Sequence, residues 1–261
     1  MSISYLEYGL ESGYIHNWLV AGPHAVAISD LGRFKGDDRQ LQIARHYYEE
    51  DAGISQPPMD QAAFRVGDTE LTWRYYRCLD DHFVDVSTFC HTWHYLRAWA
   101  YTQIKCSSSQ EATFILTTNG PADLWLRGQH IHRQEHFHLQ EPQSVSFQAM
   151  LEEGDNEILV RFEQVALQEC PYVMALQITG LSSEAAKAMV VRVPTAVQRP
   201  DRHQAFEHIF DHAYLDENVV YRGDVIGLRW ADHLDKRWTV AYLVQDEGHW
   251  NYLNGTTEAK A

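Results

Sequence analysis

The chain has 261 residues, of which 45% are hydrophobic and 22% are charged, so it is long and apolar enough for one large domain or two small ones, and whole-chain disorder is excluded. Its formal net charge of −15 would repel polyanions, which excludes nucleic acid and anionic membrane surfaces as expected partners. The 8 Trp, 14 Tyr and 10 Phe favour strands, where flat side chains pack on a pleated surface.

The N-terminal residues predict neither a leader nor a membrane span. Residues 1–18 lack a basic start and a continuous apolar stretch, and no segment reaches the roughly 18 apolar residues of a membrane helix. The four cysteines form no CxxC pair, so a disulfide framework is disfavoured. We therefore expect a cytoplasmic location.

The first predicted strand in chain order is Trp18–Pro23, and it ends at Gly22-Pro23 because proline cannot continue a ladder. A polar, irregular insertion is expected at about residues 30–60, with a helical turn near residues 40–48. Further strands are expected at residues 69–78, 82–86, 93–105 and 111–118.

The centre of the chain carries the clearest strand pattern. In residues 122–126 and again in residues 158–162, successive side chains alternate with a period of two. Turn signals lie at Asn119-Gly120-Pro121 and at Gly154-Asp155-Asn156. Many short strands divided by turns are typical of an antiparallel β-sandwich, so we predict a mainly β fold.

Three parts are expected along the chain. Residues 1–181 should form the sandwich, and residues 182–202 should form a linker that contains Pro194 and Pro200. Residues 203–261, with a helix at the start and strands near 219–230 and 237–244, are too short of strands to stand alone. We expect this part to begin a second, incomplete β unit and the chain to be the front of a longer protein.

Four central segments occur in a characteristic order. They are residues 112–120 (ATFILTTNG), 122–128 (ADLWLRG), 151–161 (LEEGDNEILVR) and 174–178 (MALQI). This order resembles the galactose-binding-like, jelly-roll modules found near the N-terminus of bacterial glycoside hydrolases. One departure is Arg127, because that family usually has Asn before the glycine. The resemblance implies a β-sandwich that either binds a sugar or packs against a catalytic domain.

A histidine-rich run in residues 129–139 is the candidate metal site. On one continuous strand, His130, His132, His136 and His138 would share a face, and imidazoles at that spacing can bind zinc. The interpretation that we prefer is an amphipathic strand with polar residues facing water. Apart from this metal, no cofactor is expected.

An aromatic-rich region is the candidate ligand site. Its members are Trp73, Tyr75, Tyr76, Trp93, His94 and Trp99. Aromatic side chains at alternate positions most often pack in a core, which is the interpretation that we prefer. The alternative is a sugar-binding surface of exposed rings and polar groups. The candidate ligand-binding residues are then Trp93, His94, Tyr76 and Arg127.

No catalytic residue is assigned from the sequence, which lacks GxSxG, P-loop, GxGxxG and HExxH patterns. We therefore expect a non-catalytic accessory region of a larger carbohydrate-active enzyme, a glycoside hydrolase if the resemblance holds. Its partner would be a catalytic domain of the same polypeptide or a carbohydrate. The alternatives are a free-standing carbohydrate-binding module and a metal-dependent enzyme that uses the 130–138 strand.

Overall fold

The computed structural model describes residues 3–54, 56–138, 140–197, 200–211, 213–215, 228–230, 238–246 and 249–259. The chain divides into two compact units, residues 1–198 and residues 199–261, and each is described by itself. Among the described residues, no helix is long and apolar enough to cross a membrane.

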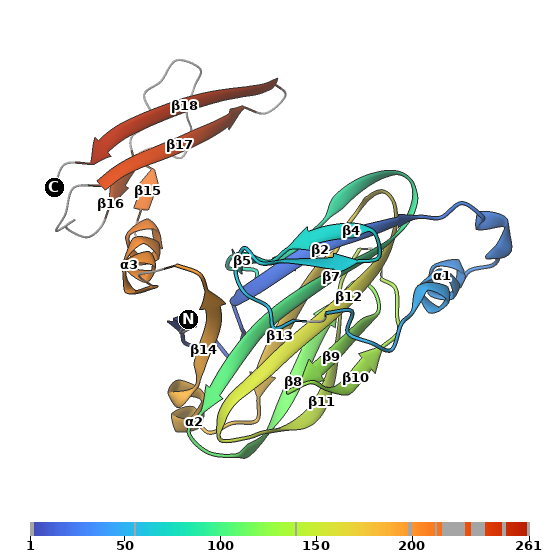
Figure 1. Ribbon diagram of the computed structural model, residues 1–261, viewed down its shortest axis with the longest axis horizontal. Helices are drawn as coiled ribbons and strands as arrows, with labels where there is room; N and C mark the ends of the chain where they lie inside the picture. Colours follow the sequence, from blue (N-terminus) through green and yellow to red (C-terminus); the bar gives the residue numbers. More distant parts are fainter. Residues whose placement is uncertain are drawn as a thin grey trace. The chain divides into compact units, whose positions relative to one another are not determined.

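The first unit is built on a large antiparallel sheet (Figure 1). Its strands in spatial order are β1 (Ser4–Tyr8), β14 (Val190–Thr195), β7 (Thr88–Cys106), β12 (Gly154–Cys170), β9 (Ala122–Leu126) and β10 (Gln129–Gln134), with β2 (Asn17–Ala27) on β7 and β5 (Arg74–Arg77) on β2. The long strands β7 and β12 form the centre. Strands β2 and β14 pair with successive parts of the same edge of β7.

A smaller antiparallel sheet faces the large one (Figure 1). Its strands in spatial order are β11 (Gln143–Leu151), β8 (Gln110–Thr118), β13 (Val173–Thr179) and β6 (Val84–Asp85). The two sheets enclose a buried apolar cluster, here called the inner core, which includes Phe114 of β8, Leu176 of β13 and Phe162 of β12. The expected mainly β, antiparallel sandwich is therefore confirmed.

The opposite side of the large sheet, here called its outer face, is covered by the insertion after β2. The insertion contains a 3-10 turn at Leu31–Arg33, helix α1 (Arg39–Tyr47), β3 (Ala63–Val66) and β4 (Thr69–Thr72). Helix α1 buries Ile43 and Ala44 in a cluster with Tyr95 and Val165 of the sheet. The ring of Phe64 stacks on Trp73 at 5.0 Å. The insertion therefore forms a third layer, which its irregular, polar sequence did not indicate.

The expected linker at residues 182–202 is wrong for most of its length. Helix α2 (Ser183–Ala188), capped by the Ser182 hydroxyl, leads into β14, which pairs with both β1 and β7. Val191 and Val193 of β14 are fully buried, so this strand belongs to the sandwich. Pro194, which suggested a linker, lies beyond the last β14 residue paired with β7, where its missing N–H removes no bond to that strand.

The described residues of the second unit form helix α3 (Pro200–Asp211) and two antiparallel strand pairs. β15 (Ala213–Leu215) pairs with β16 (Leu228–Trp230), and β17 (Trp238–Asp246) pairs with β18 (His249–Ala259). Of the strand expected near residues 219–230, only residues 228–230 lie within the described part of the chain. That this unit begins a larger β domain stays a prediction.

Candidate functional site

The outer face of the large sheet carries a row of buried aromatic and charged side chains. Because side chains of a strand alternate between its two faces, every second residue of β7, β9 and β12 points away from the inner core. These residues are Tyr95, Arg97, Trp99 and Tyr101 on β7, Asp123 and Trp125 on β9, and Leu159, Arg161 and Glu163 on β12. The sequence pattern of these strands thus separates an apolar side from a charged side.

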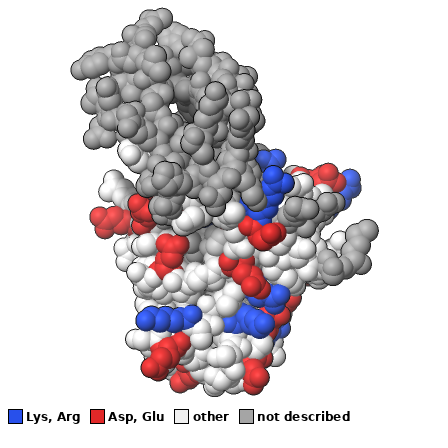
Figure 2. All heavy atoms as spheres, turned by 90° about the vertical axis from the view of Figure 1, so that its left-hand side faces the viewer, with Lys and Arg blue, Asp and Glu red and all other residues white. Residues whose placement is uncertain are grey.

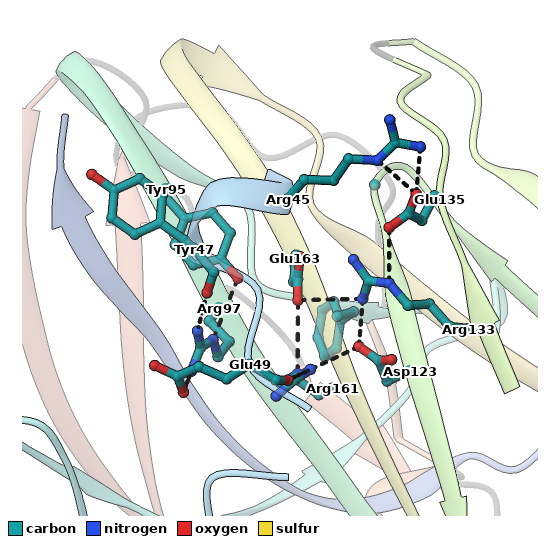
Figure 3. A network of polar contacts seen from close by, with 12 residues as sticks. Arg45, Tyr47, Glu49, Tyr95, Arg97, Asp123, Arg133, Glu135, Arg161 and Glu163 are labelled. Carbon is teal, nitrogen blue, oxygen red and sulfur yellow. Dashed lines mark hydrogen bonds and ion pairs between the residues drawn. The ribbon is translucent and has the colours of Figure 1, made fainter. Parts of the chain in front are cut away.

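Asp123 lies at the centre of a polar network on this face (Figure 3). Its Oδ2 accepts hydrogen bonds from Arg161 Nη2 at 2.9 Å and from Arg133 Nη1 at 2.7 Å. Its Oδ1 lies 2.8 Å from His130 Nε2. The side chains of Asp123 and Arg161 are both fully buried, so each charge depends on the other for the solvation that water no longer provides.

Glu163 is the second buried acid of the network. Its Oε1 lies 3.7 Å from both Arg133 Nη1 and Arg161 Nε, beyond hydrogen-bond distance, and neither carboxyl oxygen has a hydrogen-bond partner among the described residues. Burial raises the pKa of Glu163, and the two guanidinium groups offset this effect only in part. This carboxyl group therefore favours its protonated form more strongly than an exposed glutamate does.

The segment after α1 crosses this network and is held by it. We call residues 48–54 and 56–58 the strap. Arg161 donates to the backbone carbonyls of Glu49 and Asp51, and the indole N–H of Trp99 donates to that of Ala52 at 2.7 Å. Arg97 Nη1 donates to the Glu49 carboxylate at 2.8 Å, and Figure 3 shows Arg97 and Arg161 reaching Glu49 from the sheet. The buried arginines thus fix the strap through its backbone.

A cleft of about 490 Å³ opens between the strap and the sheet. The strap contributes Glu50, Asp51, Ala52, Ile54, Gln56, Pro57 and Pro58, and the sheet side contributes Tyr101, Trp125, Gly128, Glu157 and Leu159. The Tyr101 hydroxyl donates to Glu157 Oε1 at 3.2 Å, and burial raises the pKa of Tyr101 far above its ordinary value. The cleft therefore places carboxylates beside largely buried rings, and its volume suits a small molecule.

The four candidate ligand residues from the sequence are not brought together. Tyr76 packs against the inner core, and its hydroxyl accepts from the backbone N–H of Asp85. Trp93 packs against the cluster around α1, on the outer face. His94, its neighbour on β7, lies 2.8 Å from the Thr92 carbonyl through Nδ1. Arg127 is exposed in the β9–β10 turn with a φ of 51° and lies 3.5 Å from Glu152. None of the four lines the cleft.

The four histidines do not share a face. The β10 register shifts between His130 and His132, so His130 contacts Asp123 on the outer face while the ring of His132 stacks on Phe147 of the small sheet at 4.0 Å. His136 and His138 lie beyond the end of β10, and their ring centres are 5.2 Å apart. In the part of the chain that the structure describes, no three His, Cys, Asp or Glu residues could hold a metal ion. The geometry gives the metal-site hypothesis no support.

Sequence reasoning missed the cleft and the network beside it. The period-two alternation in residues 122–126 and 158–162 predicts strands, but it does not indicate that the charged positions Asp123 and Arg161 lie buried under another layer. A signal was nevertheless present in the polar insertion expected at about residues 30–60, because a segment of that length can cover one face of a neighbouring sheet. Charged residues on that covered face then need partners.

The surface also bears on the kind of partner. On the face drawn in Figure 2, acidic and basic side chains are interspersed among uncharged ones, and the described residues of that face show no basic patch. This arrangement agrees with the net charge of −15. It does not suit a phosphate backbone, which needs clustered Lys and Arg.

Comparisons with known proteins gave no family model and no curated protein that matches. Similar solved structures include an α-xylosidase of family GH31 from Xanthomonas citri, at 16% identity and a TM-score of 0.28, over 42% of this chain and 13% of that one. A family 35 carbohydrate-binding module from Clostridium thermocellum is similar at 13% identity and a TM-score of 0.27, over 38% of this chain and 89% of that one.

A β-glucosidase from Kluyveromyces marxianus is similar at 12% identity and a TM-score of 0.34, over 46% of this chain and 16% of that one. The chain thus spans 13% and 16% of the two enzymes. Each of these three similarities lies in less than half of this chain.

Proposed function

We propose that the first unit is a non-catalytic accessory module of a carbohydrate-active enzyme, and that it binds a saccharide in the cleft beside the strap. The observation that carries the proposal is the cleft itself, which the acidic residues Glu50, Asp51 and Glu157 line together with Trp125 and Tyr101. Saccharides offer C–H groups to aromatic carbon and hydroxyl groups to carboxylate acceptors, so this pairing suits them.

A binding role fits the position of the acids better than a hydrolytic role. Glycoside hydrolysis needs a protonated acid close to the bond that is cleaved. Glu163, the buried acid whose pKa is raised, is not among the residues that line the cleft. The Glu157 carboxylate, which does line it, accepts from the Tyr101 hydroxyl and is thereby oriented to accept from a ligand. These features support recognition without bond cleavage.

Saccharide binding is tested by titrating the full chain with a panel of oligosaccharides, followed by calorimetry and by the indole N–H resonances. At least one saccharide should bind and shift the Trp125 indole signal. Glu157→Gln should weaken binding about tenfold or more, because a hydrogen bond to a charged group contributes ~1.5–3 kcal/mol. Glu111→Gln, which changes an exposed acid of β8 on the small sheet, is the matched control. If no saccharide binds, the proposal fails.

The accessory role has its own test in the natural reading frame. A catalytic domain encoded in the same frame would support attachment to an enzyme. A frame that encodes these residues alone would contradict it and would favour the free-standing binding module instead.

A further inference from the structure

The described residues that line the cleft include acids but no basic residue. Glu50, Asp51 and Glu157 are the acids, and none of the described lining residues is Lys or Arg. All three residues are exposed. Asp51 Oδ1 accepts from the Gly53 N–H, and Glu157 Oε1 accepts from the Tyr101 hydroxyl, and neither of these donors neutralises the charge of the acid.

Arg161 is a buried cation beside the cleft, and its guanidinium group is paired with other residues. The guanidinium carbon of Arg161 lies 5.1 Å from the ring centre of Trp125, but the side chain is fully buried. Its Nη1 donates to the Asp51 carbonyl, and its Nη2 donates to the Glu49 carbonyl and to Asp123. Arg161 thus neutralises Asp123 rather than the carboxylates in the cleft.

A metal ion does not suit this arrangement. The described residues include no group of three acids or histidines close enough to hold one ion, so the three carboxylates are too far apart to chelate. The cleft volume of about 490 Å³ is that of a small-molecule site. Trp125, Leu159 and Ile54 also line it, and they offer apolar surface that a hydrated cation does not use.

An anionic sugar is disfavoured because its charge has the same sign as that of the acids in the cleft. Two like charges about 4 Å apart near a protein surface repel by roughly 4 kcal/mol, and the net charge of −15 adds to that field. A protonated amine on the sugar ring gains the same interaction with the opposite sign. The apolar wall accommodates the ring, and the Gln56 amide adds a donor and an acceptor for hydroxyl groups.

We infer that the cleft selects a cationic saccharide, an amino sugar whose amine is free and protonated. The ammonium group lies on the acidic side of the cleft, held by at most two of the carboxylates of Glu50, Asp51 and Glu157, and the C–H groups of the ring lie against Trp125 and Leu159. This inference rests on the proposed function, because it names the class of saccharide that the same cleft takes.

The experiment is calorimetric titration of the full chain at low salt with five small probes. They are the β-1,4-linked trimer of glucosamine, its N-acetylated form, the neutral glucose trimer, trigalacturonate, and 1,5-diaminopentane as an amine without a ring. The glucosamine trimer should bind at least about tenfold more tightly than each of the other four.

Matched variants separate the cleft from the overall charge. The double variant Glu50→Gln with Glu157→Gln should lower the affinity for the glucosamine trimer at least about tenfold, to the level of the neutral trimer. Glu111→Gln with Glu141→Gln removes the same charge from exposed positions that do not line the cleft, and it should leave the affinity unchanged. An equal loss in both double variants overturns the inference, because attraction would then come from the net charge.

The other possible results separate the failure of the inference from the failure of the proposed function. If the neutral or acetylated trimer binds as tightly as the amine, selection for a cation is wrong while saccharide binding stands. If diaminopentane binds as tightly as the glucosamine trimer, the site recognises amines and not sugars. If none of the four saccharides binds, both the inference and the proposed function fail.

Discussion

The two faces of the large sheet are built from the same strands but follow different physical rules. On β12, Phe162 belongs to the apolar inner core, while its neighbours Arg161 and Glu163 are buried on the outer face. The inner core needs only shape and apolar area. The outer face holds charges whose desolvation must be offset by partners. The difference teaches that a functional site can be buried on the face of a sheet that an alternating sequence pattern predicts to be exposed to solvent.

The largest effect is expected from Asp123→Ala, which leaves Arg161, Arg133 and His130 without their shared partner. Removal of one member of a buried ion pair destabilises by ~3–5 kcal/mol, and we expect the free energy of unfolding in urea to fall by that amount. Asp155→Ala, which removes an exposed carboxylate that pairs with Arg192, is the control and should cost less than about 1 kcal/mol. Equal losses in the two variants would contradict the contrast between buried and exposed charge.

The next effect is that of Leu124→Ala, which changes the residue between Asp123 and Trp125 on the opposite face of β9. A cavity in the inner core should lower the free energy of unfolding by ~2–5 kcal/mol. Amide exchange at Gly53 in the strap should nevertheless stay as slow as in the unchanged chain. Asp123→Ala should accelerate exchange there. If both variants had the same free energy of unfolding and both accelerated amide exchange at Gly53, the two faces of the sheet would not respond independently to substitution.

A smaller, pH-dependent effect is expected from Glu163→Gln. Burial raises the folded-state pKa of Glu163 above its unfolded value of about 4.3. The contribution of protonated Glu163 to the free energy of unfolding is therefore complete below the unfolded pKa, and it is lost as pH rises through the folded-state pKa. Glutamine does not ionise, so the variant should gain stability relative to the unchanged chain as pH rises, by at most ~1.4 kcal/mol per pH unit. Urea unfolding from pH 4 to pH 8 measures this difference. A difference that does not change with pH would mean that the pKa is not raised.

The smallest effect is expected at the exposed rim of the network. Arg45 donates two hydrogen bonds to Glu135, and with Arg133 it lowers the pKa of Glu135 despite the opposing effect of partial burial. Arg45 is largely exposed, so Arg45→Ala should reduce the free energy of unfolding by less than about 1 kcal/mol, and added salt should diminish the difference. A loss of several kcal/mol would place Arg45 with the buried charges instead.

The sandwich could be predicted from the sequence because its signal is local. Alternation in residues 122–126 and 158–162, with turns at Gly120 and Gly154, places each strand independently of the others. The role of β14 is missed because Pro194 and Pro200 suggest a linker, although Val190, Val191 and Val193 are β-branched residues that favour a strand. The expected shared face of the histidines failed at the register shift after His130, which depends on pairing with β9.

The cleft could not be predicted for a related reason. Asp51 and Trp125 are 74 positions apart by their residue numbers, and they line one cleft only because Arg161 and Trp99 hold the carbonyls of the strap. No pattern in residues 48–58 predicts these hydrogen bonds, because every residue has a backbone carbonyl whatever its side chain. What the sequence does show is charged residues at alternate positions of otherwise apolar strands, in a chain with a polar insertion at about residues 30–60.

The pairing of β1 with β14 gives this unit a property of practical use. Ser4 and Thr195 lie opposite each other in neighbouring strands, so the two points at which the polypeptide enters and leaves the sandwich are about one strand spacing apart. A short peptide could join them to give a circularly permuted chain, and the whole unit could be spliced into a surface loop of an unrelated host without stretching it. Conversely, expression that stops at residue 181 would omit β14 and leave bare edges on β7 and β1 for other molecules to pair with.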